Sequence, residues 1–192
     1  MINMNLINFI DPISDLAILA GEAILEVYNS DFEIEEKSDL SPLTEADLRS
    51  HKVIIRGLKS IDPKIPIISE EDNLQNFDKR KNWKRYWLID PLDGTKEFIN
   101  KNGEFTVNIA LIDNNKPVLG VVHVPVSAET YIACQGFGSK KIDSQGMIKT
   151  ISVRKKVNNP IKVIGSRSHR GNSLLKFLDN LGDYQFYSVG SS

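Results

Sequence analysis

The segment WLIDPLDGT at residues 87–95 constrains the fold and chemistry of this chain more than any other. Its first three apolar residues predict a short buried strand, and the carboxylates Asp90 and Asp93 follow where that strand should end. Gly94 then allows the backbone to turn, so that a helix can begin at Thr95. Carboxylates at a strand end suit hard cations such as Mg²⁺, and N–H groups at a helix start can bind phosphate. The segment therefore predicts a site where a metal ion meets a phosphate.

Length and composition narrow the class of protein. The 192 residues fit one domain better than two. The chain has 24 Lys and Arg and 25 Asp and Glu, which leaves a net charge of −1. This balance predicts no general affinity for nucleic acid or anionic lipid. The single Cys134 excludes an intrachain disulfide and is expected to be packed in a strand. Because no basic segment opens the chain and no apolar run approaches the ~18 residues of a membrane span, we expect a cytoplasmic protein with no transmembrane segment.

The apolar patterns predict a mixed α and β chain folded in layers. Asp11 and Pro12 are typical of a helix start, and apolar residues follow at helical spacing to Val27. A second helix is expected after Thr44, with Leu48, Ile54, Ile55 and Leu58 as its buried side chains. Short strands should follow at 65–68, 105–111, 118–124, 130–134, 141–142, 148–153, 161–164 and 186–189, with a further helix at 173–181.

The acidic segment Ser69-Glu70-Glu71-Asp72 follows the strand expected at 65–68. Such a cluster is usually a solvated turn. Two acidic strand ends in one layered domain can also converge on one cavity, and Glu70 would then lie near Asp90 and Asp93. Three carboxylates close together repel one another, and a divalent ion relieves that repulsion. The Leu92 carbonyl would be a further ligand.

Thr44 and Asp47 allow two interpretations. Their spacing is close to a capping box, in which each side chain accepts a hydrogen bond at the start of a helix. Alternatively Asp47 faces the metal site and polarises a hydroxyl that orients water, and the two roles are compatible. Thr95 likewise is either a helix cap or the hydroxyl beside a metal-bound water.

The three histidines are scattered along the chain. His51 is expected on the surface of the second helix, and His123 in a hairpin strand. His169 ends the polar cluster Ser166-Arg167-Ser168-His169, for which a turn is the simplest interpretation.

These motifs together resemble one family. A Glu-Glu pair after a strand (Glu70-Glu71), Asp-Pro-Leu-Asp-Gly-Thr (residues 90–95) and an upstream Thr-x-x-Asp (residues 44–47) are similar to the signatures of the Mg²⁺-dependent, lithium-sensitive inositol monophosphatase superfamily. The segments 96–98 and 102–110, with Ser166 to His169, resemble its 3'(2'),5'-bisphosphate nucleotidase branch more than inositol monophosphatases, which remain the alternative.

The resemblance implies a layered αβαβα sugar-phosphatase fold and a phosphomonoesterase that converts adenosine 3',5'-bisphosphate, or its sulfated form, to the monophosphate. Glu70, Asp90, Asp93 and the Leu92 carbonyl would hold Mg²⁺, and water activated by the metal, Thr95 and Asp47 would attack in line. The substrate would contact Glu70, Leu92, Asp93, Gly94, Thr95, Ser166 and His169. Residues 1–153 would form the metal and phosphate portion of a single domain, and 154–192 the start of its second α/β portion.

The family's pattern continues beyond the equivalent of Gly190 to Ser192, into a Trp-Asp-x-Ala-Ala-Gly motif that supplies another metal carboxylate. We therefore expect one ligand and part of the nucleotide pocket to be missing from this sequence. The chain would then be an inactive remnant, or a complementing C-terminal fragment would complete it. A peripheral position at the inner face of the cell membrane is compatible with the same resemblance.

Overall fold

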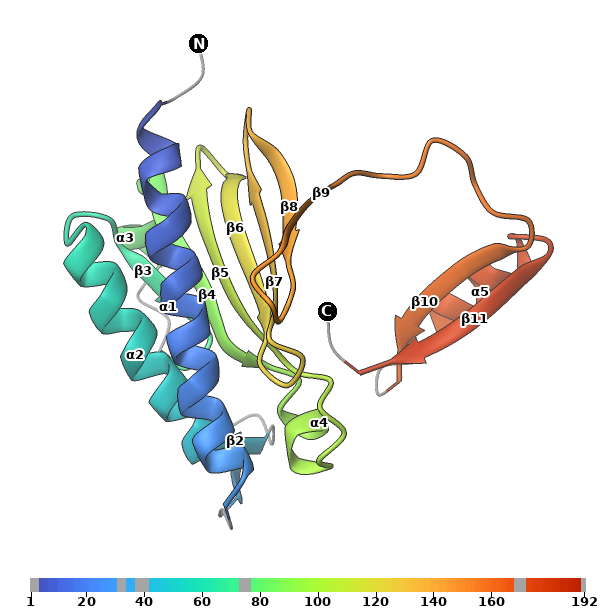
Figure 1. The fold of residues 1–192 in the computed structure, drawn as a ribbon, viewed down its shortest axis with the longest axis horizontal. Coiled ribbons are helices and arrows are strands. Elements are labelled where there is room, and N and C mark those ends of the chain that lie inside the picture. Colours follow the sequence, from blue (N-terminus) through green and yellow to red (C-terminus); the bar gives the residue numbers. More distant parts are fainter. Residues whose placement is uncertain (1–3, 31–33, 37–41, 73–76, 168–171, 191–192) are drawn as a thin grey trace.

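In the computed structural model a seven-stranded sheet forms one layer of the main body, and the long helices cover one of its faces (Figure 1). The structure describes residues 4–30, 34–36, 42–72, 77–167 and 172–190. β3 and β4 are parallel and every later neighbouring pair in this sheet is antiparallel. The strands follow one another in chain order: β3 (Ile67–Ser69), β4 (Arg85–Asp93), β5 (Thr106–Asp113), β6 (Lys116–Val124), β7 (Glu129–Cys134), β8 (Gly138–Ile142) and β9 (Ile148–Ile151).

Two long helices, α1 (Met4–Tyr28) and α2 (Glu45–Ile61), lie side by side over one face of this sheet (Figure 1). The apolar face predicted for α1 is buried as expected, from Ile13 to Val27. The predicted helix start at Asp11 and Pro12 is wrong, because α1 begins a further two turns earlier and contains Pro12. Leu6, which is 3% exposed, packs in the core, so burial of this first segment outweighs the local start signal.

The second helix begins after Thr44, as predicted. Its residues Ile54 and Leu58 are fully buried, and Ile55 packs against the core. Leu48, however, is 37% exposed, so the prediction that it is buried is wrong. Polar side chains lie on the buried face instead, because Asp47 and Ser50 are both 0% exposed.

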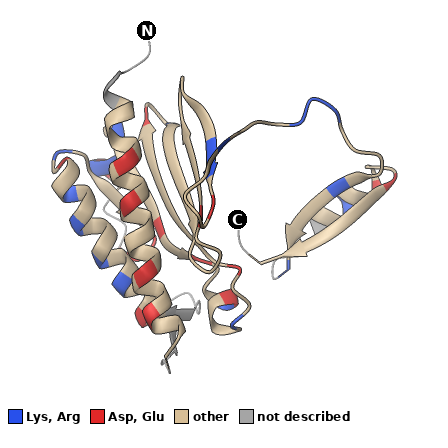
Figure 2. Ribbon diagram, in the orientation of Figure 1, with Lys and Arg blue, Asp and Glu red and all other residues tan. Residues whose placement is uncertain are grey.

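The outer surfaces of the two helices carry opposite charges (Figure 2). Asp11, Asp15, Glu22 and Glu26 are exposed along α1, and Arg49, Lys52, Arg56 and Lys59 along α2. One ion pair joins the two helices, between Arg49 and Glu26 at 3.3 Å. These charges face solvent on the side away from the sheet, and across the described ranges no helix is long and apolar enough to cross a membrane.

A small unit follows the sheet (Figure 1). It contains the parallel strands β10 (Ile161–Ser166) and β11 (Tyr184–Val189), joined through α5 (Asn172–Asp179), so the elements predicted at 161–164, 173–181 and 186–189 are present with slightly shifted ends. The remaining described elements are short: β1 (Ile34–Glu36) pairs with β2 (Pro42–Thr44), and α3 (Phe77–Arg80) and α4 (Thr95–Ile99) flank β4.

Candidate active site

The strand β4 ends differently from the prediction. It continues through Asp90 to Asp93, with an irregular register between these two residues where Asp90 pairs with Asn108 and Asp93 with Thr106. A bulge of this kind turns side chains away from regular alternation. The hydroxyl of Ser50 on α2 donates a hydrogen bond of 2.7 Å to the Pro91 carbonyl inside the bulge. The two aspartates therefore lie on an anchored, irregular strand end.

Gly94 is the N-cap residue that directly precedes the short helix α4. Its φ is 97°, a left-handed conformation that glycine adopts without strain. Thr95 is the first helical residue, so the interpretation of Thr95 as the cap is wrong. Phe98 anchors α4 to the core, because its ring is fully buried and packs against the rings of Tyr28 and Phe105.

Asp47 forms the capping box considered from the sequence and also contacts Thr95. One carboxylate oxygen, Oδ2, accepts hydrogen bonds from the Thr44 backbone N–H (2.8 Å) and the Thr44 hydroxyl (2.6 Å), which completes the capping box. The other oxygen, Oδ1, accepts a hydrogen bond of 3.2 Å from the Thr95 hydroxyl. The helix cap thus holds the carboxylate in place, and the carboxylate orients the hydroxyl of Thr95 across a separation of 48 residues.

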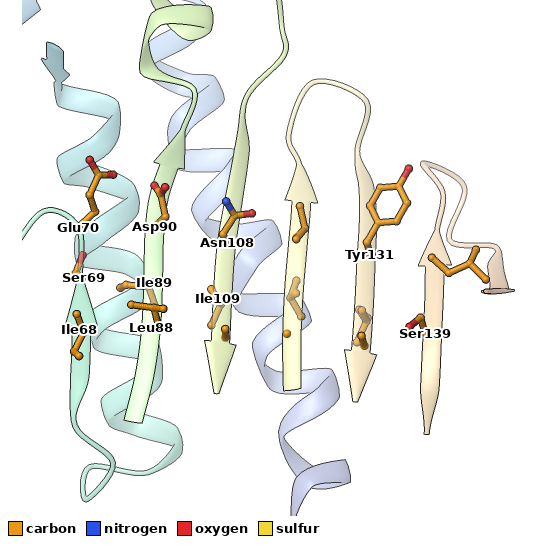
Figure 3. Close-up of a pocket in the computed structure, with 17 residues that line it drawn as sticks. Ile68, Ser69, Glu70, Leu88, Ile89, Asp90, Asn108, Ile109, Tyr131 and Ser139 are labelled. Carbon is orange, nitrogen blue, oxygen red and sulfur yellow. The ribbon is translucent and has the colours of Figure 1, made fainter. Parts of the chain in front are cut away.

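Glu70 and Asp90 lie side by side at the same end of β3 and β4 (Figure 3). The pKa of the Asp90 carboxyl is raised to about 8, first by burial and then by the nearby charges of Glu70 and Asp93. The Asp90 Oδ1 atom is buried and has no hydrogen-bond partner among the described residues. The structure therefore brings Glu70, Asp90 and Asp93 close together. In this surrounding the ionised form of Asp90 is disfavoured.

This arrangement fits a hard divalent cation in its chemistry. An unpartnered, buried carboxylate oxygen beside two further acidic side chains is a donor set that Mg²⁺ prefers, and a cation would replace the proton on Asp90. Within the described part of the chain, no three His, Cys, Asp or Glu side chains stand in a ready metal geometry. The carboxylates thus fit a cation by the type of their donor atoms and by the charge that a cation would neutralise, and not by a ligand geometry that is already formed.

An open concavity of about 770 Å³ runs from these carboxylates over the sheet. Figure 3 shows Glu70, Asp90 and Asn108 at one end of it and apolar side chains such as Ile68 and Leu88 beyond. The Asn108 amide oxygen accepts a hydrogen bond of 3.2 Å from the hydroxyl of Thr106. The end of the concavity that carries Glu70, Asp90 and Asn108 is therefore the part that can bind a cation or a charged group of a substrate.

Of the predicted substrate residues in the second portion, Ser166 lies at the end of β10, and His169 lies outside the described residues. The neighbouring Arg167 forms an ion pair with Glu104 at 2.8 Å and approaches Glu97 on α4 at 3.8 Å. The Gly190 N–H also donates to Glu104, at 2.6 Å. These contacts bring the end of β10 beside α4.

Sequence reasoning missed three residues that shape the site, namely Ser50, His51 and Arg167. Ser50 and His51 follow Asp47 at i+3 and i+4, the spacing that places residues on one helix face, and that spacing was the available signal. Arg167 stands in the polar cluster of residues 166–169 that the sequence singled out, but its partners could not be named, because Glu97 and Glu104 are more than sixty residues away.

Comparison with known proteins places the chain in a family. The profile of the inositol monophosphatase family matches residues 6–192. A 3'(2'),5'-bisphosphate nucleotidase CysQ of Escherichia coli is 48% identical over 185 residues, which cover 95% of this chain and 73% of that protein. The CysQ of Buchnera aphidicola is 42% identical, over 95% of this chain and 68% of that protein.

Solved structures of the inositol monophosphatase family have the same fold as this chain. The crystal structure of CysQ from Bacteroides thetaiotaomicron, a bacterial member of the inositol monophosphatase family, superposes with a TM-score of 0.74 at 34% identity, covering 92% of this chain and 70% of that one. SuhB from Bartonella henselae, at 23% identity and a TM-score of 0.77 over 94% of this chain and 70% of that one, shares the fold. This chain belongs to the inositol monophosphatase family and is a phosphatase of the layered α and β fold.

Proposed function

We propose that this phosphatase removes the 3'-phosphate of adenosine 3',5'-bisphosphate, leaving adenosine 5'-monophosphate and inorganic phosphate, in a reaction that requires Mg²⁺. The sulfated form of the same nucleotide is a second substrate of the same chemistry. The observation that carries the proposal is the cluster of Glu70, Asp90 and Asp93 beside the Asp47–Thr95 pair, in a chain 48% identical to a bisphosphate nucleotidase.

In this proposal Glu70, Asp90, Asp93 and the Leu92 carbonyl would hold Mg²⁺, and the ion would supply positive charge for the phosphate and lower the pKa of a bound water. The N–H groups at the start of α4 face the phosphate, because the first N–H groups of a helix have no acceptor within it. Ser166 and His169 contact the nucleotide.

The Asp47–Thr95 pair orients the attacking water. Because the Thr95 hydroxyl donates its proton toward Asp47 Oδ1, its oxygen lone pairs face away from that bond and accept a hydrogen bond from water. Asp47 is fully buried, so its negative charge acts on Thr95 with little screening by solvent. The pair thereby holds a water with one proton engaged and its own lone pair free to attack the phosphorus in line.

The test is phosphate release from adenosine 3',5'-bisphosphate, with and without Mg²⁺, by the chain completed with the C-terminal region of a relative such as the Escherichia coli CysQ, and by its variant Asp90→Asn. We expect cation-dependent release that Asp90→Asn abolishes, whereas Asp78→Asn, on the exposed helix α3, leaves it unchanged. Equal activity of wild type and Asp90→Asn would contradict the proposal. A clear preference for inositol phosphate would replace the nucleotide with a sugar-alcohol substrate.

A further inference from the structure

The side chains of His51, Ser69 and Asp72 contact one another next to Glu70, and they have no part in the reaction described above. The His51 Nδ1 atom on α2 is 2.9 Å from the hydroxyl of Ser69, and its Nε2 atom is 3.5 Å from Asp72 Oδ1. The histidine side chain is 17% exposed, so the expectation of an ordinary surface residue is wrong. His51 thus contacts both ends of the four-residue segment that carries Glu70.

A nucleophilic Ser-His-Asp arrangement does not explain this cluster. In such triads the serine contacts Nε2 and the aspartate contacts Nδ1, whereas His51 has these contacts reversed. Ser69 is also only 1% exposed, and its Oγ atom accepts a hydrogen bond of 3.3 Å from the Glu71 N–H. Although Ser69 lies in the wall of the concavity, its hydroxyl is buried and engaged with His51 and Glu71, so it is not placed as a nucleophile.

The contacts of the turn indicate a structural task instead. The Asp72 N–H donates to the Ser69 carbonyl at 3.4 Å, which closes the turn, and the Glu70 N–H donates to the Ile89 carbonyl of β4 at 3.2 Å. The Ser69 hydroxyl can donate to Nδ1 of His51 when the ring proton is on Nε2, and Nε2 is the nitrogen that lies 3.5 Å from Asp72 Oδ1. The backbone around Glu70 is therefore fixed on one side by β4 and on the other by His51.

Repulsion among the neighbouring carboxylates explains why the position of this turn has to be fixed. Glu70 lies close to Asp90 and Asp93, so three acidic side chains share a small volume and repel one another whenever they are ionised. The Ser69–Asp72 turn follows a strand of only three residues, so its position depends on side-chain and backbone contacts such as those of His51. His51 is on the same helix face as Asp47 and Ser50, which contact Thr95 and the Pro91 carbonyl, so one rigid helix sets the positions of all three segments.

We propose that His51 is a positioning residue, which braces the Ser69–Asp72 turn so that Glu70 is held in the geometry that binds the divalent cation. The inference rests on the proposed function in one respect only, that Glu70 is a cation ligand. Residues that orient metal ligands from behind typically change metal affinity 10- to 100-fold when they are removed. His51 therefore acts on cation affinity and not on contact with the nucleotide.

The experiment compares His51→Ala, His51→Asn and Ser69→Ala with wild type. Calorimetric titration with Mg²⁺ alone gives the cation dissociation constant, and phosphate release gives the KM for the nucleotide at saturating Mg²⁺. We expect His51→Ala and Ser69→Ala to raise the dissociation constant about 10- to 100-fold and the half-saturating Mg²⁺ concentration by the same factor, with KM within about 2-fold. His51→Asn, which keeps an acceptor near Ser69, should restore part of the affinity. Lys52→Ala, at the neighbouring exposed position, is the matched control and should equal wild type.

Wild-type cation affinity in both His51→Ala and Ser69→Ala would overturn the positioning role. A change in KM equal to the change in cation affinity would also overturn it, because a general disturbance of the site would then explain both. If His51→Ala fails to fold, the milder Ser69→Ala and His51→Asn decide the question. The calorimetric measurement needs no substrate, so failure to hydrolyse the bisphosphate overturns the proposed substrate and leaves the test of His51 intact.

Discussion

The protonation of Asp90 makes the metal-free protein sensitive to pH in a direction that a single substitution can test. The pKa of Asp90 rises from 3.8 in a solvated chain to about 8 in the fold, chiefly because burial removes water from the carboxylate. Between these values the folded protein keeps a proton that the unfolded chain releases. Asp90→Asn removes the titrating group while it preserves the size of the side chain.

The sign and size follow from proton linkage. Because the folded state binds more protons than the unfolded state between pH 3.8 and about 8, the free energy of unfolding falls as pH rises through this window. One proton gives at most ~1.4 kcal/mol per pH unit. From pH 5 to pH 7 we expect the wild type to lose on the order of 2–3 kcal/mol relative to Asp90→Asn.

The assay is urea unfolding at pH 5, 6 and 7 with a chelator present, followed by the fluorescence of the two tryptophans, of which Trp87 is fully buried. Comparing the two proteins at each pH cancels all other titrating groups. Asp90→Asn should be the more stable protein at pH 7, and saturating Mg²⁺ should remove that advantage by stabilising only the wild type. Parallel stability curves across this pH range would refute the reasoning, since Asp90 would then carry no extra proton in the fold.

Three further substitutions test other parts of the structure. Asp47→Asn should lower kcat about 100-fold or more, because a weaker acceptor no longer orients Thr95, and unchanged turnover would contradict that role. Burial lowers the pKa of His123 from 6.5 to about 4, so wild-type stability should fall as pH drops from 6.5 toward 4, by up to ~1.4 kcal/mol per unit, and the slope should vanish in His123→Asn in urea titrations. Phe98→Ala should cost about 3–5 kcal/mol in thermal or urea unfolding, since the ring is fully buried beneath α4; a loss below 1 kcal/mol would show that α4 does not depend on it.

The sequence predicted the fold where local periodicity decides structure. The buried stripe of α1 and the alternating strand β5 follow from residue spacing alone, since each places its apolar side chains on one face. The errors occurred where a distant contact outweighs a local signal. Pro12 lies inside α1 because Leu6 joins the core, and Leu48 is exposed although its type favours burial.

The sequence associated the acidic residues of the candidate site but gave no indication of the contacts that hold them. Asp90, Asp93 and Glu70 could be associated because each was expected to follow a strand, and strand ends of one sheet meet at one edge. The pairing of Ser50 with the Pro91 carbonyl spans 41 residues, and that of Arg167 with Glu104 spans 63. Residue type alone names no partner at such distances, so these contacts required coordinates.

One regularity of the site was nevertheless present in the sequence. Asp47, Ser50 and His51 are spaced as i, i+3 and i+4, an arrangement that normally marks an apolar face, but here all three are polar. Polar side chains on the buried face of a helix need partners, because an unpaired buried polar group costs free energy. Each has a partner in a different segment: the Thr95 hydroxyl, the Pro91 carbonyl and the Ser69 hydroxyl. A single helix face thus fixes the relative positions of α4, the bulged end of β4 and the Ser69–Asp72 turn, so a substitution on this face should disturb the site geometry more than the fold.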